Sequence, residues 1–523
     1  MSAVLRKKIV IFLFIIGTFL SLWGINYPFV GIYNTNNNYL SLAAKNYQRF
    51  GIVNLKFFPT YFAGEHFTSG SSYYLHHPIL IFLLSAIPII IFHFQNWSVH
   101  ATNFLFVVGD AFMIYVIAKE LWDKKTAIWA VGLASVFPMA TFFWKYIFFE
   151  QASMFFSLGI YYLLIRYLKK PTGKLLLNIL LLTLFSGFID WGVLYFLFPL
   201  GIFFFTKYKK AVIKPFVIYL LGAGMSLGIF VVCVYVLQHG LKDLSTAIWG
   251  RSYTAELTSL SAWPIRLLVI SVLRAILYFT PISIAAIWLF CKECKKKILL
   301  PQLSLIFIFL YGLLNLIFLP AASWGHSYFL YYFIPFFAFS GGLVMVRLEK
   351  YRMWLWCMVG LIILTSVAVN YLKIQQVKKQ LWKYDVAREI NRTLKPFETI
   401  GVVNFAGDVF ENYYLHPSQP IEYAKLNDWV LGSSFSDVPK TVYVCAGKCT
   451  GDELAKATSL KSLGLVTTYE AGGNEAWLIT RRGQSAVPVT EIVRPDTVTE
   501  IGDKNIFLRI YRMLRDTLNV GQI

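Results

Sequence analysis

The 523-residue chain has few charged side chains: Asp, Glu, Lys and Arg make up 14% of it, whereas 57% is hydrophobic and 18% aromatic. This scarcity of charge excludes an ordinary soluble globular protein, in which about a quarter of the residues are charged. Long apolar runs recur from Ile9 to Leu372. We therefore predict a mostly α, polytopic membrane protein over the first three quarters of the chain.

Acidic residues are the scarcest charged type, and the formal net charge is +21. Glu65 is the only carboxylate between Met1 and Gly109. Such a balance could indicate a nucleic-acid partner. The basic residues, however, stand in short clusters between apolar runs, which is typical of cytoplasmic loops of membrane proteins. No nucleic-acid partner is predicted.

The six cysteines form no metal-binding pattern, and Cys291 and Cys294 make a lone CxxC pair. Cys445 and Cys449 lie in "CAGKC". If that segment faces an oxidising space, we expect a disulfide there, with two free thiols as the alternative. The sequence has no internal repeat.

The apolar runs predict about eleven spans, numbered here by residue: 9–27, 101–118, 126–143, 149–165, 175–189, 191–205, 211–237, 266–290, 298–319, 328–346 and 353–372. Six basic clusters separate them: 6–8, 119–125, 166–174, 207–210, 291–297 and 347–352.

A further apolar stretch, Ile79–Phe94, decides the topology. If it does not cross the membrane, all six basic clusters fall on one side, which the positive-inside rule makes cytoplasmic. The stretch is short and Pro88 interrupts it. We predict a re-entrant or juxtamembrane helix at 79–94 on the outer side, with the N-terminus cytoplasmic, in the cell membrane.

Three domains follow from the change in composition. Residues 1–372 form the transmembrane domain, 373–485 a small extracytoplasmic α/β domain, and 486–523 a tail with a basic amphipathic helix. "ETIGVVNFAG" and "KTVYVCAG" predict buried strands, "YDVAREINRTL" and "GDELAKATSLKSLG" predict helices, and "PSQPIEYAKLNDWV" is typical of a loop.

Polar groups at the outer membrane face are the candidate site, because ionisable residues at membrane depth are costly and usually functional. In the first outer loop, Asn34, Asn36 and Asn37 either cap a helix or bind sugar hydroxyls. The same loop also carries Glu65, and His76 and His77 follow it.

Four further places could contribute. Glu150, with Lys145 before it, begins a span as a dipole-stabilised or a functional carboxylate. Asp190 is a structural or functional carboxylate in a turn. The others are His326 with Tyr328, at the start of a late span, and the pair Arg251 and Arg266, which either clamp a phosphate or snorkel. Asp110 is expected to pair with a polar group on a neighbouring helix.

Several segments, in this order, resemble the GT-C glycosyltransferases, in the branch of the protein O-mannosyltransferases and lipid A aminoarabinose transferases. They are the stretch from Tyr39 to Gly51, "YYLHHPIL", "ATNFLF", "AKELWDKKTAIWA", "YIFFEQASMFF" and "GHSYFLYYFIP". The resemblance covers roughly residues 6–390. It implies transfer of a sugar from a polyprenyl-phosphate donor to a lipid, glycan or protein acceptor at the outer face.

The chain departs from this pattern in one respect. The catalytic acid of these enzymes falls within "YNTNNNY", which contains none. Either Glu65 or a histidine of the His76–His77 pair then supplies the base, or the acceptor needs none. Glu150 matches the acid that orients the acceptor or a divalent metal. No other cofactor is implied. The alternatives are an inactive protein of this fold that binds lipid-linked sugar or glycan, and a transporter.

Overall fold

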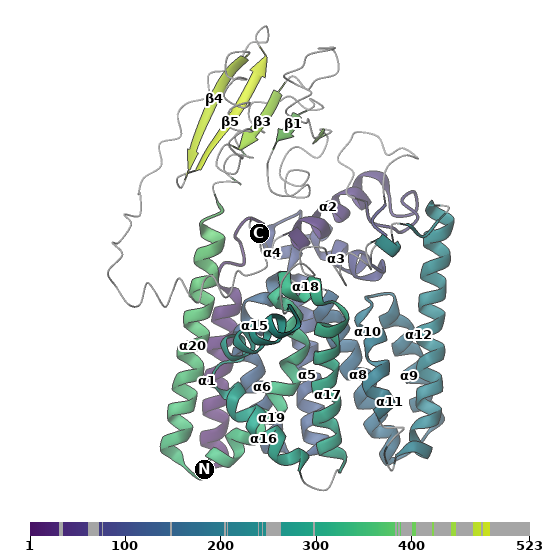
Figure 1. Cartoon of the computed structure of the whole chain (residues 1–523), viewed down its shortest axis with the longest axis vertical. Helices are drawn as coiled ribbons and strands as arrows, with labels where there is room; N and C mark the ends of the chain where they lie inside the picture. Colours follow the sequence, from purple (N-terminus) through teal and green to yellow (C-terminus); the bar gives the residue numbers. More distant parts are fainter. Residues whose placement is uncertain are drawn as a thin grey trace. The chain divides into compact units, whose positions relative to one another are not determined.

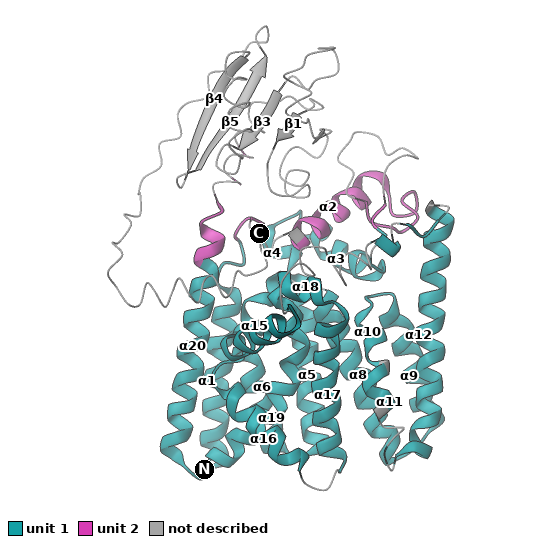
Figure 2. Ribbon diagram, viewed as in Figure 1, with its two compact units in different colours: residues 1–26, 75–374, 506–523 teal, residues 27–74, 375–505 magenta. Residues whose placement is uncertain are grey.

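The computed structural model describes residues 1–30, 35–60, 73–75, 77–146, 149–202, 206, 208–238, 240–242, 244–246, 263–295, 299–381, 384, 388, 400–403, 421–422, 441–445, 464–471 and 474–481. Two compact units are present: residues 1–26, 75–374 and 506–523 form unit 1, and residues 27–74 and 375–505 form unit 2 (Figure 2). Unit 1 is a bundle of helices (Figure 1).

The first half of unit 1 contains the helices that carry most of the candidate site. Their bounds are α1 Ala3–Leu22, α3 Leu80–Ile91, α4 Asn96–Val99, α5 Ala101–Leu121, α6 Lys124–Val136, α7 Pro138–Thr141, η1 Phe143–Lys145 and α8 Phe149–Lys169. Asp123 caps α6 by accepting a hydrogen bond from the Thr126 N–H at 2.7 Å. Pro138 ends α6 and opens α7, because a proline cannot donate to the preceding turn.

The second half continues the bundle. Its helices are α9 Gly173–Gly187, α10 Gly192–Tyr195, α11 Leu197–Ile202, α12 Lys209–Gln238, α15 Trp263–Tyr278, α16 Ile282–Cys294, α17 Leu300–Phe318, α18 Pro320–Gly325, η3 Ser327–Phe333, α19 Ile334–Leu348 and α20 Arg352–Lys378. The core lies where α6 and α19 pack together, with α5 and α8 beside them.

The polytopic helical fold predicted from the sequence is confirmed. By length and composition, five helices of the described residues can cross a membrane, or seven if each of two bent pairs counts as one span. This number is smaller than the eleven spans expected. The helices α1, α8 and α9 lie at three of the other expected positions.

Three expected spans are not the continuous helices predicted. Residues 126–143 break at Pro138, where the chain bends by 55°. Residues 266–290 divide into α15 and α16, which meet at a bend of 115°. Thr280 adopts a left-handed backbone there (φ 63°) immediately before Pro281, and that combination ends a helix. Residues 191–202 form the two short helices α10 and α11 instead of one span.

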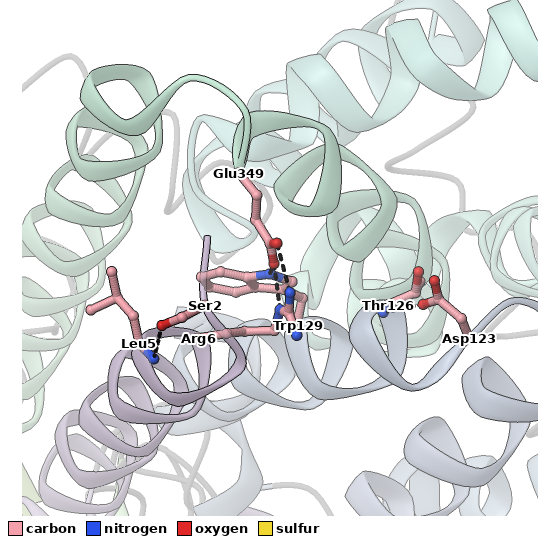
Figure 3. Close-up of polar contacts among 7 residues, drawn as sticks. All are labelled: Ser2, Leu5, Arg6, Asp123, Thr126, Trp129 and Glu349. Atoms are coloured by element: carbon pink, nitrogen blue, oxygen red, sulfur yellow. Dashed lines mark hydrogen bonds and ion pairs between the residues drawn. The ribbon is translucent and has the colours of Figure 1, made fainter.

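A buried ionic cluster joins α1, α6 and α19 in unit 1 (Figure 3). Arg6 donates two hydrogen bonds to the carboxylate of Glu349, and the Trp129 indole N–H donates to the same carboxylate at 2.8 Å. All three side chains are buried. The cluster fixes the register of three helices that are far apart in sequence.

Unit 2 contains two sets of described residues. Helix α2, Thr35–Phe50, begins inside the asparagine cluster, so Asn36 and Asn37 lie within the helix and do not precede it. Within this stretch the Asn46 amide donates to the Thr60 carbonyl at 2.7 Å, and the Asn38 amide donates to the Phe29 carbonyl at 3.1 Å.

The second set is a five-stranded mixed sheet with the order β2-β1-β3-β5-β4. Its strands are β1 Ile400–Val403, β2 Ile421–Glu422, β3 Thr441–Cys445, β4 Gly464–Ala471 and β5 Asn474–Arg481. The two predicted strands are confirmed as β1 and β3, which pair in parallel. The loop expected around residue 421 is wrong in one detail, because Ile421 and Glu422 add a short strand to β1.

Several expectations lie outside the described residues: the disulfide to Cys449, the helices expected in residues 384–394 and 451–464, and the tail 486–523. The domain boundaries 372/373 and 485/486 remain predictions, as does the outer-side placement of residues 79–94. Helix α20 continues beyond Leu372 to Lys378.

Candidate functional site

A histidine and an aspartate from distant segments meet in unit 1. His77 Nδ1 lies 2.9 Å from Asp190 Oδ1, and both side chains are buried. The His77 ring also stacks on Phe149, with centroids 4.0 Å apart and planes 16° apart. The ring is therefore held at its edge and on one face.

The backbone brings this pair together. The Leu80 N–H donates to the Phe188 carbonyl at 2.9 Å, which joins the start of α3 to the end of α9. His77 precedes this bond by three residues and Asp190 follows it by two. This one main-chain hydrogen bond therefore places the two side chains near each other.

The second oxygen of Asp190 is also engaged. The Ser153 hydroxyl donates to Oδ2 at 3.2 Å, and the Gly192 N–H donates to it at 3.3 Å. Burial alone would raise the pKa of the Asp190 carboxyl. The hydrogen bond from His77, with those from the N–H groups of Trp191 and Gly192, outweighs that effect and holds this pKa below its ordinary value. Asp190 is therefore ionised at neutral pH.

Glu150 follows the phenylalanine on which His77 stacks. It is buried and lies in the first turn of α8, where the helix dipole favours a negative charge. Asn103 and Gln151 both donate to the Trp144 carbonyl, at 3.3 and 2.8 Å. The bond from Gln151 ties the first turn of α8, where Glu150 lies, to Trp144.

Hydroxyl groups extend the polar region into the bundle. An added Cβ at Gly192 would lie 2.8 Å from both the Ser153 and the Tyr332 hydroxyl oxygens. The expected pairing of Asp110 is confirmed, because the Tyr331 hydroxyl donates to Asp110 Oδ2 at 3.4 Å.

Unit 1 contains three buried cationic side chains, and two of them, Lys145 and Lys373, lie over neighbouring aromatic rings. Lys145 Nζ donates to the Trp23 carbonyl at 2.8 Å and lies over the Phe142 ring. Lys373 Nζ lies 6.0 Å from the centroid of Phe143 and 5.9 Å from that of Tyr278. The Phe143 and Tyr278 rings are themselves in edge contact, 5.1 Å apart.

Arg274 is the third cation, one turn before Tyr278 on α15. Its guanidinium donates to the Ser323 and Trp324 carbonyls at 3.0 and 3.1 Å. These bonds hold α18, which leads into His326. The imidazole of His326 stacks on Tyr328 with centroids 5.0 Å apart. The cations and this histidine thus belong to one connected region of unit 1.

The structure brings together some of the residues predicted for the site but not all. His77 and Asp190 are in contact, and Glu150 follows Phe149, on which His77 stacks. Lys145 is one of the three buried cations, and His326 with Tyr328 follows the segment that Arg274 binds. Arg266 is exposed on α15, whereas Asn36 and Asn37 lie in the first turn of α2, in unit 2. The candidates outside the described residues are Asn34, Glu65, His76 and Arg251.

Sequence reasoning missed Arg274, Lys373 and Ser153 as members of the site. A signal for Arg274 was present, since it is a lone charge inside the apolar run "VISVLRAILYF". Lys373 follows the last predicted span directly and resembled an ordinary flanking lysine. Ser153 carried no signal, because one serine on a helix face is common.

A divalent metal at Glu150 would need further ligands. Among the described residues no group of three or more His, Cys, Asp and Glu side chains is placed to hold a metal ion. His77 and Asp190 bind one another instead. No chemical step is therefore routed through a metal.

The fold has clear relatives among solved structures. ArnT from Cupriavidus metallidurans bound to undecaprenyl phosphate matches with a TM-score of 0.61 and 9% identity, covering 91% of this chain and 97% of that one. An oligosaccharyltransferase from Archaeoglobus fulgidus, in complex with Zn and sulfate, matches with a TM-score of 0.55 and 15% identity, covering 90% and 72%. This chain has the GT-C fold.

A third match shows the same fold with other ligands. AglB of Archaeoglobus fulgidus, in complex with an inhibitory peptide and a dolichol-phosphate, has a TM-score of 0.52 and 13% identity, covering 93% of this chain and 75% of that one. No protein-family profile and no curated protein sequence matches the chain. The GT-C likeness therefore rests on three-dimensional structure.

Proposed function

We propose that this GT-C protein is a glycosyltransferase that moves a sugar from a polyprenyl-phosphate-linked donor to an acceptor at the outer face of the membrane. One observation carries the proposal. Three buried cations, Lys145, Arg274 and Lys373, lie in the same unit as a buried histidine–aspartate pair, and the two lysines lie over neighbouring aromatic rings. Such a unit offers both a binding place for a phosphate and an acid–base group.

The chemistry of the leaving group explains the cations. A phosphate diester of a sugar leaves as a polyprenyl phosphate, whose negative charge needs stabilisation more than it needs a strong acid. Buried cations supply that stabilisation well, because water screens them little. The donor-phosphate wall is therefore assigned to Lys145, Arg274 and Lys373, with His326 next to it. Of the arginines expected to clamp a phosphate, Arg266 is exposed and Arg251 lies outside the described residues.

The solved relatives support the donor class. ArnT has been captured with undecaprenyl phosphate and AglB with a dolichol-phosphate. Both ligands join a long isoprenoid tail to a phosphate. A chain of the same fold with a buried cationic cluster fits a ligand of this kind.

A second function is favoured by the missing acid in the first outer loop. The chain would then be an inactive GT-C-fold protein that binds lipid-linked sugar or glycan. The two alternatives share the phosphate site and differ in turnover. A transporter fits less well, because the sequence shows no inverted repeat.

Binding of undecaprenyl phosphate to the purified full chain in nanodiscs tests the donor site. We expect R274Q and K373Q each to weaken binding by about tenfold or more, in line with the loss of a charge-assisted contact. R166Q is the matched control, because Arg166 is exposed and its guanidinium donates to the hydroxyl of Tyr162 on the same helix. Equal affinities for the wild type, R274Q and K373Q would contradict the assignment.

Turnover separates the two functions. Release of undecaprenyl phosphate from undecaprenyl-phosphate monosaccharides by the wild type would support the enzyme. Tight binding of undecaprenyl phosphate, with no release of it from any of these monosaccharide donors, would favour the inactive alternative.

A further inference from the structure

The sequence has no acid where the resemblance places the catalytic carboxylate, yet the structure shows an acid–base pair close to Glu150. We propose that the acceptor of this enzyme is a neutral hydroxyl group, and that His77, oriented by Asp190, takes its proton. This inference rests on the proposed function and names its acceptor class and its base.

The hydrogen bond fixes which nitrogen of His77 can act. An ionised carboxylate only accepts hydrogen bonds, so Nδ1 of His77 carries the proton that Asp190 Oδ1 receives at 2.9 Å. The other ring nitrogen, Nε2, is then the basic atom. Stacking on Phe149 keeps the plane of the imidazole ring nearly parallel to that of the phenyl ring. The imidazole is thus set in one tautomer and one orientation.

The position of Asp190 is itself fixed. Ser153 from α8 and the Gly192 N–H hold its second oxygen, at 3.2 and 3.3 Å. The carboxylate therefore faces His77 without a competing orientation. Asp190 acts through His77 and is a positioning residue, whereas His77 would touch the acceptor.

The presence of the pair distinguishes between acceptor classes. A phosphate acceptor is already an anion and needs no base. A hydroxyl is neutral when it binds and needs a base as it reacts. An imidazole held by a carboxylate at 2.9 Å supplies that base, so the pair fits a hydroxyl acceptor.

The transfer step balances as follows. The acceptor oxygen attacks the anomeric carbon of the donor while its proton moves to Nε2 of His77. The bond between that carbon and the phosphate oxygen breaks, and its electron pair leaves with the polyprenyl phosphate. The imidazolium formed on His77 is stabilised by the Asp190 carboxylate until the proton passes to water. No oxidant, reductant or metal is needed.

Acceptor preference tests the first half of the inference. The full chain, in nanodiscs free of sugar detergent, receives undecaprenyl-phosphate glucose, mannose or galactose labelled in the sugar. Octyl glucoside offers hydroxyls, octyl phosphate offers a phosphate, and an asparagine peptide offers an amide. We expect label on octyl glucoside and none on the other two. Transfer to octyl phosphate or to the peptide alone would overturn the inference and leave the proposed function standing.

Variants of His77 and Asp190 test the second half. We expect H77A to lower kcat by about 100-fold or more with an unchanged donor KM, as for the loss of a general base. Added imidazole should restore part of that rate. D190N should move the acid limb of the kcat profile to lower pH, because a neutral amide stabilises imidazolium less than a carboxylate does.

Two controls separate chemistry from folding and from the proposed function. Binding of undecaprenyl phosphate should be equal in the wild type, H77A and D190N, which shows that the variants fold. K169Q, which alters an exposed contact with Glu120, should transfer sugar at the wild-type rate. An unchanged kcat in H77A, or a loss that imidazole does not restore together with an unmoved D190N profile, would overturn the base role. Failure of the wild type to release undecaprenyl phosphate from any donor would contradict the proposed function as well.

Discussion

Arg6 and Glu349 are 343 positions apart in the sequence and form a buried ion pair with two hydrogen bonds (Figure 3). Nη2 of Arg6 lies 2.7 Å from Oε2 of Glu349. The Trp129 indole N–H donates a third hydrogen bond to the Glu349 carboxylate. Because the pair is buried, removing one member leaves the other charge without compensation, whereas removing both need not be costly.

The first prediction concerns this pair. E349Q should destabilise the protein by about 3–5 kcal/mol, because the buried guanidinium loses its counter-charge. The double variant R6M/E349L should recover most of that loss. E120Q is the control, since the Lys169–Glu120 pair is partly exposed and contributes only about 0–1 kcal/mol. Thermal unfolding in detergent measures all three. Equal losses for E349Q and E120Q would contradict the prediction.

The second prediction concerns acid stability. Burial tends to raise the pKa of the Glu349 carboxyl, but the bonds from Arg6 and Trp129 and the charge of Arg6 hold this pKa below its ordinary value. The resulting stability is fully present above the ordinary carboxyl pKa of about 4.3 and is lost as the pH falls through the lowered one. The wild type should therefore lose stability in that acidic range more steeply than R6M/E349L. Parallel curves would show that the pair does not contribute.

The third prediction concerns Glu150. E150Q keeps the size and polarity of the side chain but removes its charge. We expect sugar transfer to fall by about 100-fold or more, as for a positioned acid–base group. E120Q again serves as the control and should transfer at the wild-type rate. If E150Q is fully active, Glu150 is not catalytic, and Glu65 becomes the next carboxylate to replace.

The fourth prediction concerns Gly192, whose N–H donates to Asp190. G192A would place a methyl group 2.8 Å from the Ser153 and Tyr332 oxygens, closer than real contacts allow. We expect this variant to displace Asp190 and to lower transfer by about tenfold or more, in keeping with the sensitivity of catalysis to small misplacements. G201A is the matched control, because an added Cβ there meets nothing within 4 Å. Equal activity in both variants would contradict the prediction.

The fifth prediction is topological. Single cysteines placed at Trp97 and Lys124, in a chain without its native cysteines, should react differently with an impermeant thiol reagent in intact cells. Position 97 should be labelled and position 124 should not, because the basic clusters indicate that Lys124 is cytoplasmic. Cys291, restored alone, is an internal control for the predicted cytoplasmic side. The reverse pattern would place Glu150 on the cytoplasmic side.

The helical elements could be predicted because apolar periodicity and basic clusters are local signals. The predicted span 149–165 lies within α8, and the run 101–118 lies within α5. The break between α15 and α16 was missed, although Pro281 was visible. A proline in an apolar run is compatible with a kinked span as well as with a sharp turn, and only packing decides between them.

The site was harder to predict than the helices. Glu150, His77 and Asp190 each stood out as a polar group near the membrane face. Their pairing was not predictable, because 113 positions separate His77 from Asp190 and no local pattern encodes the contact. The grouping of the buried cations Lys145, Arg274 and Lys373 could not be predicted for the same reason, since they come from three separate segments.

The main-chain bond between Leu80 and Phe188 has a consequence for inheritance. It sets the spacing of the segments that carry His77 and Asp190, and a backbone bond survives most changes of the side chains at its ends. Positions 80 and 188 are therefore free to vary among descendants of a common ancestor. Positions 77 and 190 should instead change together, so that a lineage that loses one of the two side chains loses the other as well.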